Sequence, residues 1–137
     1  MRMNRKIIGV ASIIAIVAIV MSVTSDSALD ESTISQTIFV DAVYEPKNKI
    51  VRITYNDNSE MTNLITLEIL GMEKTFHKEF LQNSFVETVK INSKPKYGWS
   101  TTPVVFSINH DEFGKIGLKT EIYEQGESKP RIIYSKI

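Results

Sequence analysis

Cysteine is absent from the 137-residue sequence. This absence excludes disulfide bonds, zinc sites with thiolate ligands, blue-copper sites and lipid attachment at a cysteine. Histidine is scarce, with only His77 and His110 present. Stability must therefore come from packing alone, and any copper or zinc site would need both histidines together with carboxylate or methionine ligands.

Local motifs of catalysis and nucleotide binding are also missing. The chain contains no G-x-S-x-G sequence, and its six glycines never form a phosphate-binding loop. The sequence therefore predicts a protein that is not an enzyme and that needs no cofactor.

One long hydrophobic run lies near the N-terminus. It begins at Ile7, ends at Val23, carries no charge, and follows three cations with no acid among the first six residues. Such a run would make a helix of roughly 25 Å, at the lower limit for crossing a bilayer. The basic residues before it are typical of an export signal held on the cytoplasmic side.

Three fates of this run stay open. It predicts a single-pass membrane anchor, or alternatively a signal peptide cleaved near Ser25 with secretion of the remainder, or a pilin-like assembly helix. All three place the rest of the chain outside the cytoplasm. We expect an anchor or signal over residues 1–25, a polar spacer over 26–36, and one domain over 37–137. A short helix at residues 27–32 is the alternative for the spacer.

The part of the chain after this run is mildly acidic. Three of the 16 Lys and Arg residues precede the run, which leaves 13 against 16 Asp and Glu, a net charge of −3. This balance argues against nucleic acid and against a second contact with anionic lipid. The expected partners are the membrane, through the hydrophobic run, and a protein at the cell surface or in the membrane.

From residue 37 onward the sequence has the pattern of β-strands. Runs rich in β-branched and aromatic residues are separated by turn residues, and no helical period exceeds two turns. The expected strands are residues 37–44, 50–55, 64–70, 73–80, 85–91, 104–109, 116–123 and 131–137. The charges of residues 73–80 favour an edge strand.

Alternation within these runs assigns inward faces. The expected core residues are Val51, Ile53, Tyr55, Ile65, Leu67, Ile69, Phe85, Val89 and Ile91. Short connections without crossover helices favour antiparallel pairing. The sequence therefore predicts an all-β fold, an immunoglobulin-like or fibronectin-III-like antiparallel β-sandwich of seven to eight strands, preceded by an N-terminal hydrophobic helix.

The likeness to those domains concerns architecture alone, because the Cys, Trp, Cys signature of immunoglobulin domains is missing and Trp99 falls in a loop. The whole chain also resembles the small, single-anchor, cysteine-free sandwich proteins of archaeal cell envelopes. No motif carries a function over from either group.

The longest irregular stretch, residues 92–103, holds the best binding candidates. Lys94, Lys96, Tyr97 and Trp99 combine two rigid aromatic rings with two cations, a composition typical of protein interfaces and sugar-binding platforms. The alternative is that Trp99 plugs one end of the sandwich.

Two segments offer oxygen or nitrogen ligands for a metal. His110, Asp111 and Glu112 are consecutive at a strand end, but no ligand spacing repeats elsewhere. Residues 56–60 supply oxygens for calcium, but they lack the glycine and the bidentate glutamate of an EF-hand loop. Both segments are weak candidates, and we expect a solvated loop and a plain turn.

Two functions follow. The first is a membrane-anchored extracytoplasmic binding or scaffolding module that uses residues 92–103 and the edge strand. The second is an accessory subunit of a membrane or envelope complex, or a pilin-like filament component, that assembles through its N-terminal helix. Small residues at Ala11, Ser12, Ala15 and Ala18 would allow close helix packing there.

Overall fold

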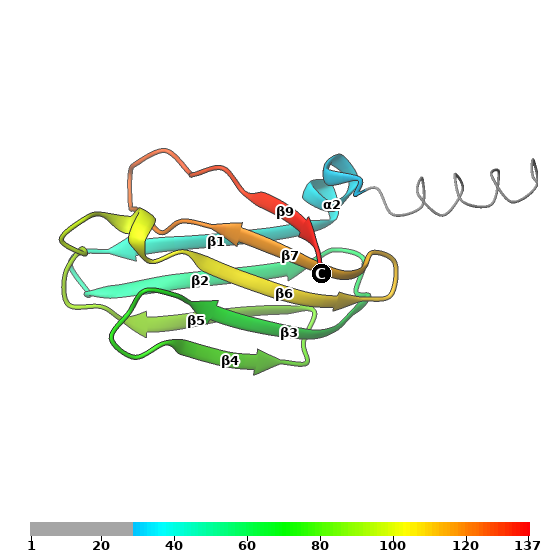
Figure 1. Ribbon diagram of the computed structural model, residues 1–137, viewed down its shortest axis with the longest axis horizontal. Helices are drawn as coiled ribbons and strands as arrows, with labels where there is room; N and C mark the ends of the chain where they lie inside the picture. Colours follow the sequence, from blue (N-terminus) through cyan, green and yellow to red (C-terminus); the bar gives the residue numbers. More distant parts are fainter. Residues whose placement is uncertain (1–28) are drawn as a thin grey trace, which may run out of the picture. The chain divides into compact units, whose positions relative to one another are not determined.

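Two β-sheets pack face to face in the computed structural model, which describes residues 29–137 (Figure 1). The sheets lie within the unit Glu31–Ile137, and the chain there is a β-sandwich, as the sequence predicts. The predicted N-terminal hydrophobic helix and the whole of residues 1–25 lie outside the described residues.

The four-stranded sheet has the order β5-β2-β1-β8 and the five-stranded sheet the order β4-β3-β6-β7-β9. The first sheet consists of β1 (Ile38–Glu45), β2 (Ile50–Asp57), β5 (Ser84–Lys90) and β8 (Tyr123–Glu124). The second consists of β3 (Thr62–Ile69), β4 (Phe76–Phe80), β6 (Val104–His110), β7 (Gly114–Thr120) and β9 (Ile133–Lys136).

Strict alternation along β2 and β3 builds the centre of the core. The predicted inward residues Val51, Ile53, Tyr55, Ile65, Leu67 and Ile69 are all fully buried, which confirms their assignment. Successive side chains of a strand point to opposite faces, so the residues between them face outward. Phe85 and Val89 are also buried, whereas Ile91 lies beyond the end of β5 and is half-buried.

The predicted strand at residues 116–123 is two strands in different sheets. β7 ends at Thr120, Ile122 is buried, and Tyr123–Glu124 then pairs in parallel with Val43 and Tyr44 of β1. The expectation of purely antiparallel pairing is therefore wrong for this pair. No crossover helix is needed, because the chain reaches β1 by leaving the opposite sheet.

A helix occupies residues that the sequence assigns to the polar spacer. α2 (Glu31–Thr37) buries Ile34, which is 1% exposed, while its other side chains are half-buried or exposed. Ile34 packs this short helix against the end of the sandwich, next to the start of β1 (Figure 1). The backbone N–H of Asn58 also donates to the carbonyl oxygen of Thr37. Within residues 29–137, no helix has the length and hydropathy to span a bilayer.

The predicted edge strand lies at an edge of its sheet, although it is shorter than expected and begins at Phe76. Lys78 of β4 pairs with Glu87 of β5 at 2.7 Å. The rings of Phe80 and Phe85 stack with their centroids 3.8 Å apart. These contacts join the two sheets along this side of the sandwich.

Candidate functional site

Trp99 is buried at one end of the sandwich. It begins the 3₁₀ helix Trp99–Thr101, its side chain is 6% exposed, and its ring lies 4.9 Å from that of Tyr44. Its indole N–H is buried without a hydrogen-bond partner among the described residues. In this position the ring fills the end of the core, and almost none of it can contact a partner.

The other three predicted binding residues are at the surface. Tyr97 is 78% exposed, and the ammonium of Lys96 lies 5.5 Å from the centre of its ring. Lys94 is exposed two residues earlier. Residues 92–103 therefore divide into a buried tryptophan and an exposed group of one tyrosine and two lysines.

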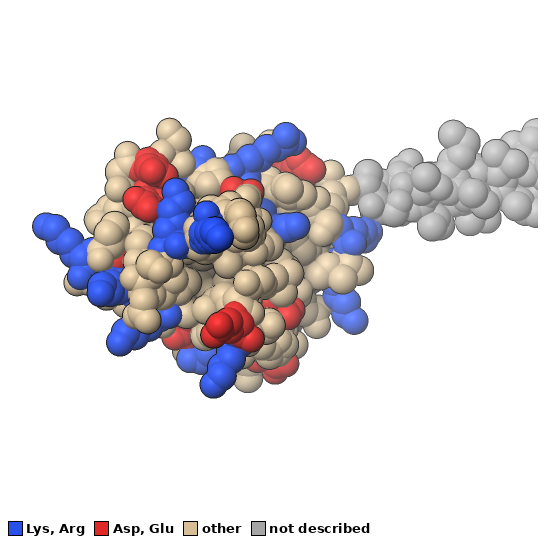
Figure 2. All heavy atoms as spheres, turned by 60° about the vertical axis from the view of Figure 1, so that its left-hand side comes forward, with Lys and Arg blue, Asp and Glu red and all other residues tan. Residues whose placement is uncertain are grey.

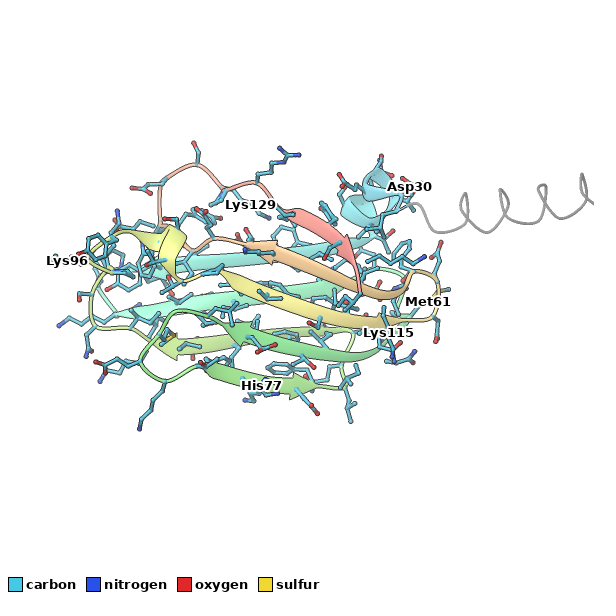
Figure 3. All side chains as sticks on the ribbon, in the orientation of Figure 1. Asp30, Met61, His77, Lys96, Lys115 and Lys129 are labelled. Atoms are coloured by element: carbon cyan, nitrogen blue, oxygen red, sulfur yellow. The ribbon has the colours of Figure 1, made fainter. Side chains whose placement is uncertain are left out.

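A groove of about 840 Å³ lies beside these residues. Its walls are the loop after β3 and the loop after β5, and its charged lining residues are Glu73, Lys74, Lys90 and Lys96. The groove is at the end of the sandwich opposite α2, as the positions of Lys96 and Met61 in Figure 3 show. Three cations and one anion give its walls a net positive charge.

Gly71 brings the two walls together. Its φ of +78° lies in the left-handed region, which side chains rarely adopt. A β-carbon here would also clash with the carbonyl oxygen of Thr101. The groove therefore depends on glycine at this position, because the loop after β3 contacts the backbone of the 3₁₀ helix at Thr101.

Charges of both signs occur over the rest of this end. Figure 2, in which the end is turned forward, shows lysines and arginines interspersed with acidic residues.

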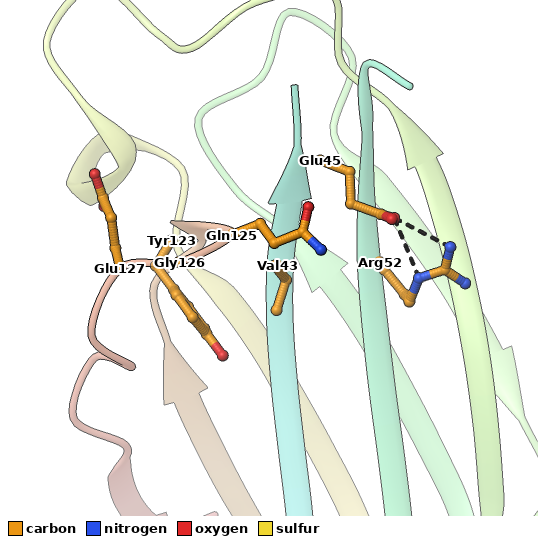
Figure 4. A pocket seen from close by; sticks show the side chains of 7 residues that line it. All are labelled: Val43, Glu45, Arg52, Tyr123, Gln125, Gly126 and Glu127. Carbon is orange, nitrogen blue, oxygen red and sulfur yellow. Dashed lines mark hydrogen bonds and ion pairs between the residues drawn. The ribbon is translucent and has the colours of Figure 1, made fainter. Parts of the chain in front are cut away.

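A second, smaller pocket of about 400 Å³ lies between Tyr123 and the ion pair of Arg52 with Glu45, in which the two charged groups are 3.1 Å apart (Figure 4). Burial and the hydrogen bond to Asp41 raise the pKa of Tyr123 to about 12. Tyr123 therefore remains a donor to Asp41.

The opposite end of the sandwich holds a buried polar cluster. Asp57 at the end of β2 and His110 at the end of β6 meet with 3.0 Å between Oδ2 and Nε2, and both side chains are fully buried. Asp57 also accepts from the hydroxyls of Ser59 and Thr62, at 2.6 and 2.7 Å, and from two backbone N–H groups. The Thr62 hydroxyl lies 2.7 Å from that of Tyr55. The cluster thus links the two sheets.

The hydrogen bonds of His110 define its role. Its Nδ1 accepts from the backbone N–H groups of Glu112 and Phe113 at 3.1 and 3.2 Å, so Nε2 carries the proton and donates it to Asp57. Ser59 lies 3.2 Å from the same Nε2 and donates its own proton to Asp57. An acyl-transfer triad needs its serine and its carboxylate on different ring nitrogens. The cluster lacks that arrangement.

Burial by itself raises the pKa of Asp57, but the hydrogen bonds from Ser59 and Thr62 and the neighbouring His110 outweigh burial and lower it. Tyr55, at the far side of Thr62, has a raised pKa because of its burial. The cluster therefore holds an ionised carboxylate and a neutral phenol over the ordinary pH range.

The weak metal candidates do not converge. Both ring nitrogens of His110 are occupied, and Asp111 accepts a hydrogen bond from the side-chain amide of Asn63 at 2.6 Å. In residues 56–60, the carboxylate that could bind calcium is the buried Asp57. No group of three His, Asp or Glu residues that could hold a metal ion occurs within residues 29–137.

No protein-family profile matches the sequence, and no curated protein matches it. The candidate site therefore rests on geometry alone.

Sequence reasoning missed the groove and the Asp57 cluster. The groove joins loops about 20 residues apart, and Asp57 and His110 are 53 residues apart in the chain. One local signal was available for the cluster. An aspartate followed by Ser59 and Thr62 is typical of a turn in which the carboxylate accepts from its own loop.

Proposed function

We propose that this protein is a membrane-anchored, extracytoplasmic β-sandwich module without catalytic activity that binds an acidic segment of a partner protein. The observation that carries the proposal is the groove lined by Lys74, Lys90 and Lys96. Its positive lining contrasts with the net negative charge of residues 26–137. Coulomb attraction would therefore favour an acidic ligand at this end over the rest of the surface.

The exposed ring of Tyr97 adds contact area to the charges. A tyrosine orders at low entropic cost and offers both an apolar face and a hydroxyl, so it contributes well to binding surfaces. It is adjacent in sequence to Lys96, which lines the groove. The predicted binding residues Lys94, Lys96 and Tyr97 thus remain part of the proposal, whereas Trp99 supports the loop from below.

The strand order supports a finer fold assignment. Strands β1, β2 and β5 share one sheet and β3, β6 and β7 share the other, as in immunoglobulin-like domains. β4 lies next to β3 and not with β5, which favours the fibronectin-III-like variant. We therefore propose a fibronectin-III-like module with two added C-terminal strands, β8 and β9.

Attachment to the membrane is proposed from sequence. The run from Ile7 to Val23 and the cations before it support a single-pass anchor. The chain reaches the sandwich through α2, at the end opposite the groove. The groove is therefore not next to the point at which the chain enters the sandwich. Assembly through the N-terminal helix, the alternative function, rests on residues that the structure does not describe.

The proposal can be tested by binding of a fluorescent peptide of ten glutamates to the full chain in mild detergent. Exposed ion pairs contribute about 0.5 kcal/mol each, so three of them contribute about 1.5 kcal/mol. The triple variant Lys74→Gln, Lys90→Gln and Lys96→Gln should therefore bind about tenfold more weakly, measured by fluorescence anisotropy.

A matched control removes the same charge elsewhere. The triple variant Lys115→Gln, Lys119→Gln and Lys136→Gln changes three exposed lysines of β7 and β9. It should bind the peptide like the unmodified chain. Equal weakening by both triple variants would show that net charge alone attracts the peptide, and absence of binding to the unmodified chain would refute the proposal.

A further inference from the structure

The outer face of the five-stranded sheet has a regular composition across its strands. In one lateral row, Thr66 of β3, Ser107 of β6 and Gly117 of β7 lie side by side. Ser135 of β9 continues this row. Small side chains in the middle of a sheet leave a flat surface that another sheet can approach closely.

The next row carries charges at symmetric positions. Glu68 of β3 pairs with Val105 of β6, and Val105 pairs with Lys119 of β7. β6 is the central strand of the five. An acid therefore lies one strand to one side of the centre and a cation one strand to the other side, in the same row. Glu68 also lies 3.6 Å from the ring of His77 on β4, with about a third of its side chain still exposed.

Apolar side chains add to this face at β9. Ile137 is 65% exposed and lines a shallow pocket with Leu64 of β3 and Ser107 of β6. Ile133, which pairs with Lys119, is 57% exposed. The face thus offers apolar area as well as complementary charge.

We infer that this face binds a second copy of the same chain. A two-fold axis along β6 exchanges the two sides of the sheet, so Glu68 of each copy meets Lys119 of the other. The same axis places Ser107 opposite its own counterpart and Thr66 opposite Gly117. An interface of this kind must be self-complementary, and Glu68 with Lys119 meets that condition.

The remaining charges of the face meet no like charge across this axis. The axis places Lys115 opposite Leu64. It also places Glu79 opposite Ser135.

The size of the face sets the strength of the association. Four strand spacings and a strand of seven residues give a face of about 450 Å² per copy. Stable complexes bury about 800 Å² per partner, so the association should be weak in dilute solution and stronger where copies are concentrated. The groove lies at the end of the sandwich and remains open in this dimer.

The absence of cysteine makes a clean crosslinking test possible. Ser107→Cys in the full chain, in mild detergent at high protein concentration, introduces one thiol on the proposed axis. Stacked sheets are about 10 Å apart and the two thiols point toward each other in that gap, so mild oxidation should give a disulfide-linked dimer. Val86→Cys is the control, because Val86 is 59% exposed on β5 in the other sheet. It should give at least tenfold less dimer.

Charge reversal identifies the occupant. In the Ser107→Cys background, Glu68→Lys or Lys119→Glu alone places like charges opposite each other twice, and should lower the crosslinking yield about tenfold. The double variant restores complementarity and should recover the yield. Recovery of the crosslinking yield in the double variant supports the dimer. This holds even if one single variant folds poorly, because the double variant contains both substitutions.

Three outcomes would overturn the inference. The first is a monomer with Ser107→Cys, which leaves the face to a different protein or to solvent. The second is equal crosslinking through Val86→Cys, which indicates non-specific contact or association through another part of the chain. The third is a double variant that stays as weak as the single variants.

Discussion

An aromatic pair lies over the core at each end of the sandwich, and the two pairs differ in their polar partners. At the α2 end, His110 stacks on Phe113 at 4.6 Å and both of its ring nitrogens form hydrogen bonds. At the groove end, Trp99 packs against Tyr44, and its N–H has no partner among the described residues.

This difference separates stability from recognition. The α2 end buries an ion and satisfies it with five hydrogen bonds from three residues of its own loop and from His110. Such a fully satisfied network holds one arrangement of the loops. The groove end has exposed lysines and the exposed Tyr97, and the buried ring of Trp99 beneath them packs against its neighbours without a hydrogen bond among the described residues. We therefore expect substitutions at the α2 end to change folding, and surface substitutions at the groove end to change binding.

The largest effect should come from the buried ring of the groove end itself. Trp99→Ala removes a large side chain from the end of the core, and the free energy of unfolding should fall by about 3–5 kcal/mol. Trp99→Phe should cost about 1 kcal/mol, because the lost indole N–H forms no hydrogen bond. Urea denaturation measures both. A Trp99→Ala variant of unchanged stability would show that the ring does not fill the core.

The next effect tests the α2 end. Asp57→Asn keeps the size of the side chain but replaces one acceptor oxygen with an NH2 group that faces other donors, so the free energy of unfolding should fall by about 2–4 kcal/mol. Asp111→Asn is the matched control, because the side chain of this exposed residue accepts a single hydrogen bond among the described residues, from the side-chain amide of Asn63. It should change stability by less than about 0.5 kcal/mol. Equal losses would remove the contrast between the buried and the exposed carboxylate.

A smaller effect should appear in acid. The lowered pKa of Asp57 means that the unfolded chain takes up its proton first. Its contribution to stability is complete above the ordinary pKa of 3.8 and is lost as the pH falls through the lower value of the folded state. Urea midpoints measured between pH 6 and pH 2 should fall less steeply for Asp57→Asn than for the unmodified chain. Parallel curves would contradict the assignment.

The strands and their inward faces could be predicted because both depend on neighbours in sequence. Alternation assigned Val51, Ile53 and Tyr55 to the core. The charged residues around Phe76 predicted an edge strand, which the structure has as β4. These features follow from the two-residue period of a strand. The same local pattern supported the two-sheet fold.

Long-range pairing was beyond this reasoning. The switch of β8 to the other sheet depends on the position of β1, about 80 residues earlier. Likewise, the fate of Trp99 depends on the space beside Tyr44, and the role of His110 depends on Asp57. The sequence drew attention to both residues, but no periodicity indicates whether a loop tryptophan turns inward or outward.

The separation of the two ends can be tested most directly by amide hydrogen exchange of the full chain with and without the ten-glutamate peptide. We predict slower exchange in residues 70–75 and 91–103, which form the walls of the groove. Exchange in residues 57–62 and 110–113, around Asp57 and His110, should stay unchanged. Protection at the α2 end, or the same small change along the whole sandwich, would contradict the account.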